Sequence, residues 1–214
     1  MKNKKDLLFS VAFFVLFILW TLLVSIVDVQ AIGPRDYSVG FATVNGMFHR
    51  LSGVHMTLYH ITDWLGLVPV GFGFGFAVLG LIQWIKRQHI LKVDHSILAL
   101  GVYYILMLAA YLFFEEFVVN YRPILINGYL EASYPSSTTL LVLCVMPTSL
   151  MQLNTRIKNQ NMRLCSAWAI KIFIAFMVLG RLLSGVHWLT DIIGGILLSI
   201  GLVALYRFLN NLKS

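Results

Sequence analysis

The sequence predicts an all-α protein that crosses a lipid bilayer several times, and two observations lead to this prediction. Of the 214 residues, 59% are hydrophobic and only 12% are charged, whereas about a quarter of the residues in a soluble domain carry a charge. The apolar residues also form long runs separated by short polar segments. Backbone groups in lipid must be satisfied within the chain, so each run is expected to be a helix.

Six runs are long enough to span a bilayer, which requires about 20 predominantly apolar residues. The first follows three lysines and resembles a signal peptide, but it is long for such a segment and lacks a small-residue cleavage site, so we interpret it as a retained helix. The predicted spans are Leu7–Val27, Leu65–Ile85, Ile97–Phe114, Thr138–Leu153, Ala167–Leu183 and Leu189–Leu209. They form a single membrane-embedded domain over residues 1–214.

The distribution of basic residues predicts the orientation. With six spans, most Lys and Arg residues fall on the side of both termini, and short basic loops mark the cytoplasm. This indicates a multi-pass plasma-membrane protein with both termini in the cytoplasm. The residues on the inner side are Lys2, Lys4, Lys5, Lys86, Arg87, Lys92, Arg156, Lys158, Arg163, Arg207 and Lys213.

The long outer connection from Asp28 to Asp63 is expected to contain one or two short interfacial helices. Apolar residues recur there at helical spacing, as in helices that lie in the plane of a membrane surface. The positions are Val44, Met47, Phe48, Leu51, Val54, His55 and Leu58.

The formal net charge of +7 does not indicate nucleic-acid binding, because the basic residues lie in short loops beside apolar segments. The histidines and the two cysteines, Cys144 and Cys165, show no spacing typical of metal ligands. The sequence therefore predicts no metal and no other cofactor. The expected partners are the bilayer and a membrane lipid.

Chemically functional residues gather at the outer mouths of three spans. His187 and Asp191 are four residues apart, which places them on one face of a helix start. A carboxylate beside one imidazole nitrogen leaves the other nitrogen available, and a free imidazole can attack phosphorus. Arg122 and Arg181 provide forked donors that suit phosphate oxygens.

A hydroxyl-rich turn, Pro135-Ser136-Ser137-Thr138, opens the fourth span. The free N–H groups of a first helical turn favour an anion. Helix capping by Ser136 would explain the turn equally well, and a His-x3-Asp pair can also simply begin a helix. The convergence of all these residues on one membrane face favours a phosphate-handling site.

These residues resemble the motifs of the type 2 phosphatidic acid phosphatase superfamily, the lipid phosphate phosphatases. That family has Lys-x6-Arg-Pro, then Pro-Ser-Gly-His, then Ser-Arg-x5-His-x3-Asp. This chain has Glu115-x6-Arg122-Pro123, then Pro135-Ser136-Ser137-Thr138, then Gly180-Arg181-x5-His187-x3-Asp191. The third motif is close to the family pattern, and the first two are eroded.

The resemblance implies a role for each matching residue. His187 would be the nucleophile and Asp191 would orient it. The phosphoryl oxygens would be bound by Arg122, Arg181, Ser136, Ser137 and Thr138. The usual Lys is Glu115 here and the usual leaving-group acid is Thr138, so Glu115 or Glu116 is a possible substitute acid.

The loss of the acid predicts the substrate class. An alkoxide leaving from a phosphate monoester requires a proton, whereas a phosphate leaving from a diphosphate is already a stable anion. We therefore expect a hydrolase that acts on a lipid diphosphate, such as undecaprenyl diphosphate, or on a lipid phosphate, through a phosphohistidine. The alternative is an impaired family member that binds, senses or moves a phosphorylated lipid. A transporter is less favoured, since no pair of broken helices is evident.

Overall fold

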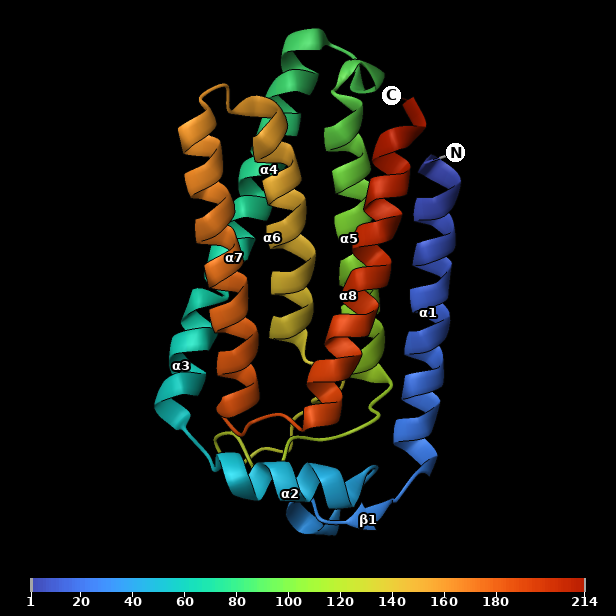
Figure 1. Cartoon of the computed structure of the whole chain (residues 1–214), viewed down its shortest axis with the longest axis vertical. Helices are drawn as coiled ribbons and strands as arrows, with labels where there is room; N and C mark the ends of the chain where they lie inside the picture. The colour runs from blue at the N-terminus through green and yellow to red at the C-terminus, as the bar shows by residue number, and fades with distance from the viewer. Residues whose placement is uncertain (1, 214) are drawn as a thin grey trace.

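Six long helices form an upright bundle in the computed structural model, which describes residues 2–213 and the side chains of residues 3–212. They are α1 (Lys2–Ile26), α4 (Leu67–Arg87), α5 (His95–Glu116), α6 (Ser137–Arg156), α7 (Gln160–Leu183) and α8 (Leu189–Asn210). Figure 1 shows both termini at one end of this bundle. The turns joining α4 to α5 and α6 to α7 lie at the same end.

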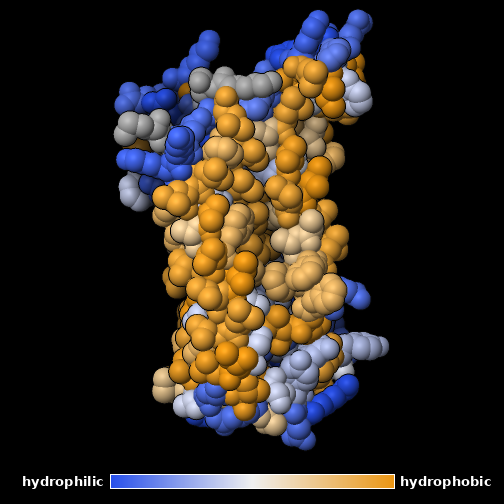
Figure 2. Space-filling view, turned by 90° about the vertical axis from the view of Figure 1, so that its right-hand side faces the viewer, coloured by the Kyte–Doolittle hydropathy of each residue, from blue (hydrophilic) through white to orange (hydrophobic). Residues whose placement is uncertain are grey.

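The protein is a multi-pass membrane protein, because five of the described helices are long and apolar enough to cross a bilayer. The segments are Asn3–Ile26, Met56–Arg87, His95–Glu116, Gln160–Leu183 and Leu189–Asn210. Figure 2 shows an apolar belt between two polar ends, as a bilayer requires. The basic loops predicted to be cytoplasmic join helix ends at the terminal side of the bundle.

The fourth predicted span is the exception to this composition. It corresponds to α6, which lies between α7 and α8 in Figure 1 but is not among the five apolar candidates. Its buried side chains include Thr139, Thr148, Ser149 and Gln152. Neighbouring helices α4, α5, α7 and α8 all contact α6, so these polar groups face protein. The number of membrane crossings therefore stays a prediction.

The other helix boundaries fall close to the predicted ones, except that α1 begins at Lys2 rather than Leu7 and that α7 begins earlier than predicted. We expected this helix from Ala167, but it begins at Gln160. The Asn159 side chain accepts hydrogen bonds from the backbone N–H groups of Asn161 and Met162 at 2.9 and 3.1 Å. This cap starts the helix in a polar segment that an apolar-run criterion leaves out.

Two short helices, α2 (Ala42–Ser52) and α3 (Met56–Leu65), occupy the predicted outer connection. It also contains the strands β1 (Gln30–Ala31) and β2 (Ser38–Val39) and the 3-10 turn Pro34–Asp36. Two further 3-10 turns lie at the other end of the bundle, Ile90–Lys92 between α4 and α5 and Asn211–Lys213 after α8. The two strands pair antiparallel. Figure 1 shows α2 lying across the end of the bundle opposite the termini.

Helix α2 presents an apolar face to the outside and a polar anchor to the bundle. Val44, Met47 and Leu51 are 43%, 52% and 79% exposed, as expected for a helix at a membrane surface. The buried Asn45 donates from Nδ2 to the Thr190 Oγ1 at 3.0 Å and accepts from the Thr190 N–H at 3.2 Å. This pair attaches α2 to the first turn of α8.

Helix α3 does not lie flat, so α2 is the interfacial helix among the one or two that were expected in this connection. Helix α3 bends directly into α4 at Gly66 and packs along α7. Gly180 of α7 permits the approach, since a Cβ at that position would lie 2.7 Å from the Thr62 Cγ2. The close contact brings α3 side chains to the outer end of α7, where Arg181 lies.

We predict that Gly185→Ala strongly destabilises the fold and displaces the segment before α8. Gly185 has φ of +70°, and an added Cβ would lie 2.0 Å from the carbonyl oxygen of Gly53. The left-handed conformation alone costs an L-residue about 1–2 kcal/mol, and the backbone clash adds to that cost. Thermal unfolding in detergent micelles measures the effect.

Gly128→Ala is the matched control, because its φ is +81° and no atom lies within 4 Å of the added Cβ. Gly128→Ala should therefore lose only the stability that corresponds to placing an L-residue in the left-handed conformation. Equal losses of stability in the two variants would contradict a tight contact between residues 53 and 185.

Candidate functional site

The segment Ser184–Trp188 joins α7 to α8 and carries His187 into the bundle. Its neighbour Val186 is fully buried and packs in a small cluster with Tyr59 and Ile126. The Ser184 carbonyl accepts a hydrogen bond from the His55 N–H at 3.0 Å. These contacts of Ser184 and Val186 hold the loop against the bundle, and His187 is only 2% exposed.

Asp191 lies in the first turn of α8 and is completely buried. Its Oδ2 accepts the Trp188 backbone N–H at 2.9 Å, and its Oδ1 accepts the Asn120 Nδ2 at 3.2 Å. The His187 Nδ1 lies 3.8 Å from Oδ2, which is contact distance but too long for a hydrogen bond. The predicted His187–Asp191 pair is therefore adjacent, and Asp191 is held mainly by other donors.

Arg122 approaches the opposite nitrogen of the imidazole. Its Nη1 lies 3.3 Å from the His187 Nε2, and its Nε pairs with the Glu131 carboxylate at 3.0 Å. The Arg122 N–H also donates to the Glu131 carbonyl at 3.0 Å. A hairpin-like loop thus carries the cation, with Tyr121 and Ala132 bridged across it.

Arg181 is 1% exposed and is held by α3. Its Nη1 donates to the Tyr59 carbonyl and to the Thr62 Oγ1, both at 3.3 Å. Its Nη2 pairs with Asp63 at 3.3 Å, and the Asp63 side chain is 55% exposed. Each contact compensates part of the cost of burying a guanidinium.

The Tyr59 ring brings the two guanidinium groups together. The Arg181 Cζ lies 4.8 Å and the Arg122 Cζ 5.9 Å from the centroid of this one ring, both within the range of cation–π attraction. Arg122 and the pair Arg181 and His187, from two distant parts of the sequence, therefore converge with Tyr59 at the end of the bundle opposite the termini.

Several buried polar atoms here lack a hydrogen-bond partner among the described residues. They are the Arg181 Nε, the Ser136 Oγ and the His187 Nδ1. Buried polar atoms in folded proteins are usually satisfied. A bound oxyanion offers several acceptor oxygens and would satisfy the two donors, Arg181 and Ser136.

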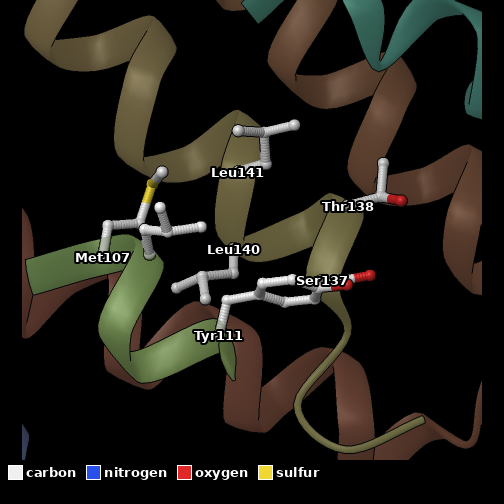
Figure 3. A pocket seen from close by; sticks show the side chains of 7 residues that line it. Met107, Tyr111, Ser137, Thr138, Leu140 and Leu141 are labelled. Carbon is white, nitrogen blue, oxygen red and sulfur yellow. The ribbon is translucent and has the colours of Figure 1, made fainter. Parts of the chain in front are cut away.

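The hydroxyl-rich turn lies beside these residues. The Ser136 N–H donates to the Asp191 carbonyl at 3.1 Å, which joins the start of α6 to the first turn of α8. Ser137 and Thr138 line a half-open cavity of about 290 Å³ whose other walls are apolar side chains of α5 and α6. Figure 3 shows their hydroxyl oxygens on the side of α6 away from Met107.

The two candidate acids, Glu115 and Glu116, do not pair with Arg122 or Arg181. Glu115 borders a small hollow that Ser133, Pro135 and Ser137 also line, and Glu116 ends α5 with an exposed side chain. The carboxylates that pair with the two arginines are Glu131 and Asp63 instead.

The residues that support the site were not assigned a role from the sequence. The most important are Tyr59, Asp63, Asn120, Glu131 and Asn45. Each contacts its partner across the fold, so no short motif links them. One signal was present: Asn120 stands two positions before Arg122 in a loop already selected for its Arg-Pro pair.

Burial and the two arginines lower the pKa of His187 well below its ordinary value. Burial is the largest cause, followed by repulsion from Arg122 and then from Arg181. The imidazole is therefore neutral at neutral pH and keeps a lone pair. A neutral imidazole between two cations has the properties of a nucleophile toward an electron-poor centre that carries anionic oxygens.

Comparison with known proteins identifies the family to which this fold belongs. The PAP2 superfamily model matches residues 8–213, so the chain belongs to the PAP2 superfamily. Among solved structures it is similar to the first transmembrane PAP2-type phosphatidylglycerolphosphate phosphatase from Bacillus subtilis. The TM-score is 0.53 and the identity 18%, and 96% of each chain is covered. No curated protein matches. Family and fold together support a lipid phosphatase.

We predict that Arg122→Gln raises the pKa of His187, because the substitution removes the larger of the two charge repulsions. Burial remains, so the pKa should stay below 6.5, the ordinary value for histidine. The titration can be followed by NMR of protein with ¹⁵N-labelled histidine in micelles, with the His187 signal assigned from His187→Gln. Arg163→Gln, at the other end of the bundle, should leave the titration unchanged. An unchanged or lower pKa in Arg122→Gln would contradict the contact at Nε2.

Proposed function

We propose that this protein is a membrane lipid phosphohydrolase that removes a phosphate from a lipid diphosphate or lipid phosphate through a phosphohistidine on His187. The observation that carries the proposal is the position of the His187 Nε2, 3.3 Å from the Arg122 guanidinium in a buried site. The lone pair of the His187 imidazole and the Arg122 guanidinium are thus close enough to contact the same phosphate group. A lipid diphosphate of the undecaprenyl type is the favoured substrate.

In the first chemical step, the Nε2 lone pair forms a bond to phosphorus, and the bond from phosphorus to the leaving-group oxygen breaks. The leaving group departs with that electron pair. Arg122 and Arg181 stabilise the charge that develops on the equatorial oxygens. Asp191 compensates the positive charge of the phosphorylated imidazole from 3.8 Å. Water then forms a bond from its oxygen to phosphorus while the bond from phosphorus to Nε2 breaks, and that electron pair returns to Nε2. The protons of the water pass to the phosphate product and to solvent, and neutral His187 is restored.

The leaving group determines how much the missing acid matters. Proton donation contributes about 10²–10⁴-fold to such reactions. Thr138 does not titrate near neutral pH and cannot take this role. A lipid monophosphate leaving from a diphosphate is a stable anion, so the diphosphate reaction proceeds without it. Glu115 remains a candidate donor for monophosphates because it borders the same turn.

The cavity between α5 and α6 is the proposed entry for the lipid chain. Its walls include Met107, Leu108 and Leu141, and it ends at Ser137 and Thr138 (Figure 3). A chain lying there would place its headgroup beside Ser136 and the buried cations. The basic loops lie at the opposite end, so we place the site on the outer face of the plasma membrane.

One observation favours the alternative, a protein that binds a phosphorylated lipid without efficient hydrolysis. Both guanidinium groups already pair with carboxylates, Arg122 with Glu131 and Arg181 with Asp63. Arg122 also contacts the nitrogen that would attack phosphorus. A substrate has to displace these interactions before chemistry begins. A phosphate-release assay distinguishes the two functions.

We predict that purified protein in detergent releases phosphate from farnesyl or undecaprenyl diphosphate, with EDTA present in a parallel sample. His187→Ala should reduce release at least about 10³-fold, because it removes the nucleophile. His60→Ala is the matched control, since His60 is exposed on α3 at the same end of the bundle. Release by the control should equal that of the wild type.

Two results would contradict this function. If wild-type protein released no phosphate from any diphosphate or monophosphate lipid but retained the lipid in pull-down, the binding alternative would hold. Release that persists in His187→Ala would exclude the phosphohistidine.

We predict that Thr138→His increases turnover of lipid monophosphates about 10–100-fold, because an imidazole can protonate an alkoxide leaving group. Turnover of diphosphates should change little. Thr57→His places the same side chain at an exposed position on α3 and should have no effect. Equal gains for both substrate classes would show that leaving-group protonation is not what limits the reaction.

A further inference from the structure

A second groove lies between α7 and α8, and none of the candidate site residues lines it. Its cavity of about 580 Å³ is the largest of those described. Pro147 and Leu143 of α6 form its floor, and Phe9 of α1 borders it. Apart from Ser199 and Arg207, all of its lining residues are apolar.

The two walls are regular helical stripes that run in opposite directions. The α7 wall consists of Ile174, Ala175, Val178 and Leu179, and the α8 wall of Ile196, Ser199, Ile200, Val203, Ala204 and Arg207. From Ile196 to Arg207 the helix rises about 16 Å. This length equals about half of the roughly 30 Å hydrocarbon core of a bilayer. The groove therefore has the length of one acyl chain in one leaflet.

Two cations flank the end of the groove that faces the chain termini. Arg207 lines the groove on α8, and its side chain is 49% exposed. Lys171 lies one turn beyond Ala175 on the same stripe of α7. The Lys171 Nζ lies 5.1 Å from the Trp168 ring centroid, so the lysine side chain extends toward the N-terminus of α7. A lysine within a membrane span is expected to extend its side chain so that the ammonium group lies near the closer membrane surface.

The charge at this end is unbalanced. Helices α6 and α7 contain no acidic residue, and the single one in α8 is Asp191 at the other end. Asp6 of α1 lies 3.8 Å from the Arg207 Nε. Among the described residues nothing hydrogen-bonds the Nη groups of Arg207 or the Nζ of Lys171. Two cations above an apolar channel complement a molecule with one anionic head and a long apolar chain.

We propose that this groove binds an acidic glycerophospholipid of the leaflet on the terminal side. One acyl chain lies between α7 and α8 against Pro147, and the headgroup phosphate lies between Lys171 and Arg207. Each cation is expected to contribute about fivefold to the preference for an anionic over a neutral lipid. This lipid is a ligand rather than a substrate, because it binds at the end of the bundle opposite His187.

The test uses full-length protein in micelles with equal amounts of dioleoyl phosphatidylglycerol and dioleoyl phosphatidylcholine, examined by native mass spectrometry. We expect the protein to retain one phosphatidylglycerol, with a preference of about thirtyfold over phosphatidylcholine. Lys171→Met and Arg207→Gln should each lower this preference about fivefold. Ala175→Trp should reduce binding of both lipids, because it fills the groove without changing charge.

Matched controls separate binding in this groove from binding elsewhere on the protein. Ile172→Trp adds the same ring to an exposed position of α7 outside the groove and should leave lipid retention unchanged. Arg122→Gln should also retain phosphatidylglycerol, which excludes binding at the outer site. Equal retention of the two lipids by wild-type protein would overturn the proposal. So would loss of lipid in Arg122→Gln, or a dimer that forms in place of the lipid adduct.

Discussion

The structure of the bundle end opposite the chain termini depends on the burial of two guanidinium groups. An unpaired charge in a low-dielectric interior is costly, so the chain must supply acceptors wherever an arginine is enclosed. Arg181 is 1% exposed, and this explains why α3 packs along α7 with a carbonyl, a hydroxyl and a carboxylate directed at it. Arg122 imposes the same requirement on its loop through Glu131. The tilt of α3 and the path of residues 120–133 follow from these two side chains.

The two buried arginines, Arg122 and Arg181, affect the protonation of His187. Repulsion and burial both favour the neutral imidazole, and a neutral ring is the form with a lone pair. Asp191 meanwhile is held by Trp188 and Asn120, so its position does not depend on the protonation of His187. The arginines that help to keep His187 neutral are therefore the same two whose burial determines the packing at this end of the bundle.

Much of this arrangement could be predicted from the sequence, and the rest had a physical reason for being missed. Long apolar runs located the helices because backbone groups in lipid must be satisfied within the chain. Arg181, His187 and Asp191 stood out because ionisable groups within or directly beside apolar spans are uncommon. The supporting residues Tyr59, Asp63 and Asn120 were not predicted. Their contacts depend on how helices pack in three dimensions, and each residue type alone is ordinary for its segment. The start of α7 was missed because a polar cap, rather than hydrophobicity, determines it.

Helix α6 has a consequence for how the molecule is assembled. The Gln152 amide donates to the Tyr206 hydroxyl of α8 and to the Ser96 carbonyl of α5, and the Thr148 hydroxyl lies 3.2 Å from the Tyr104 hydroxyl of α5. Alone in hydrocarbon, this segment would expose them to a solvent that offers no partners. It must therefore enter the bilayer together with its neighbours, or remain beside them until α8 closes the bundle. The end of the bundle that contains His187 can form only after α8 has been made.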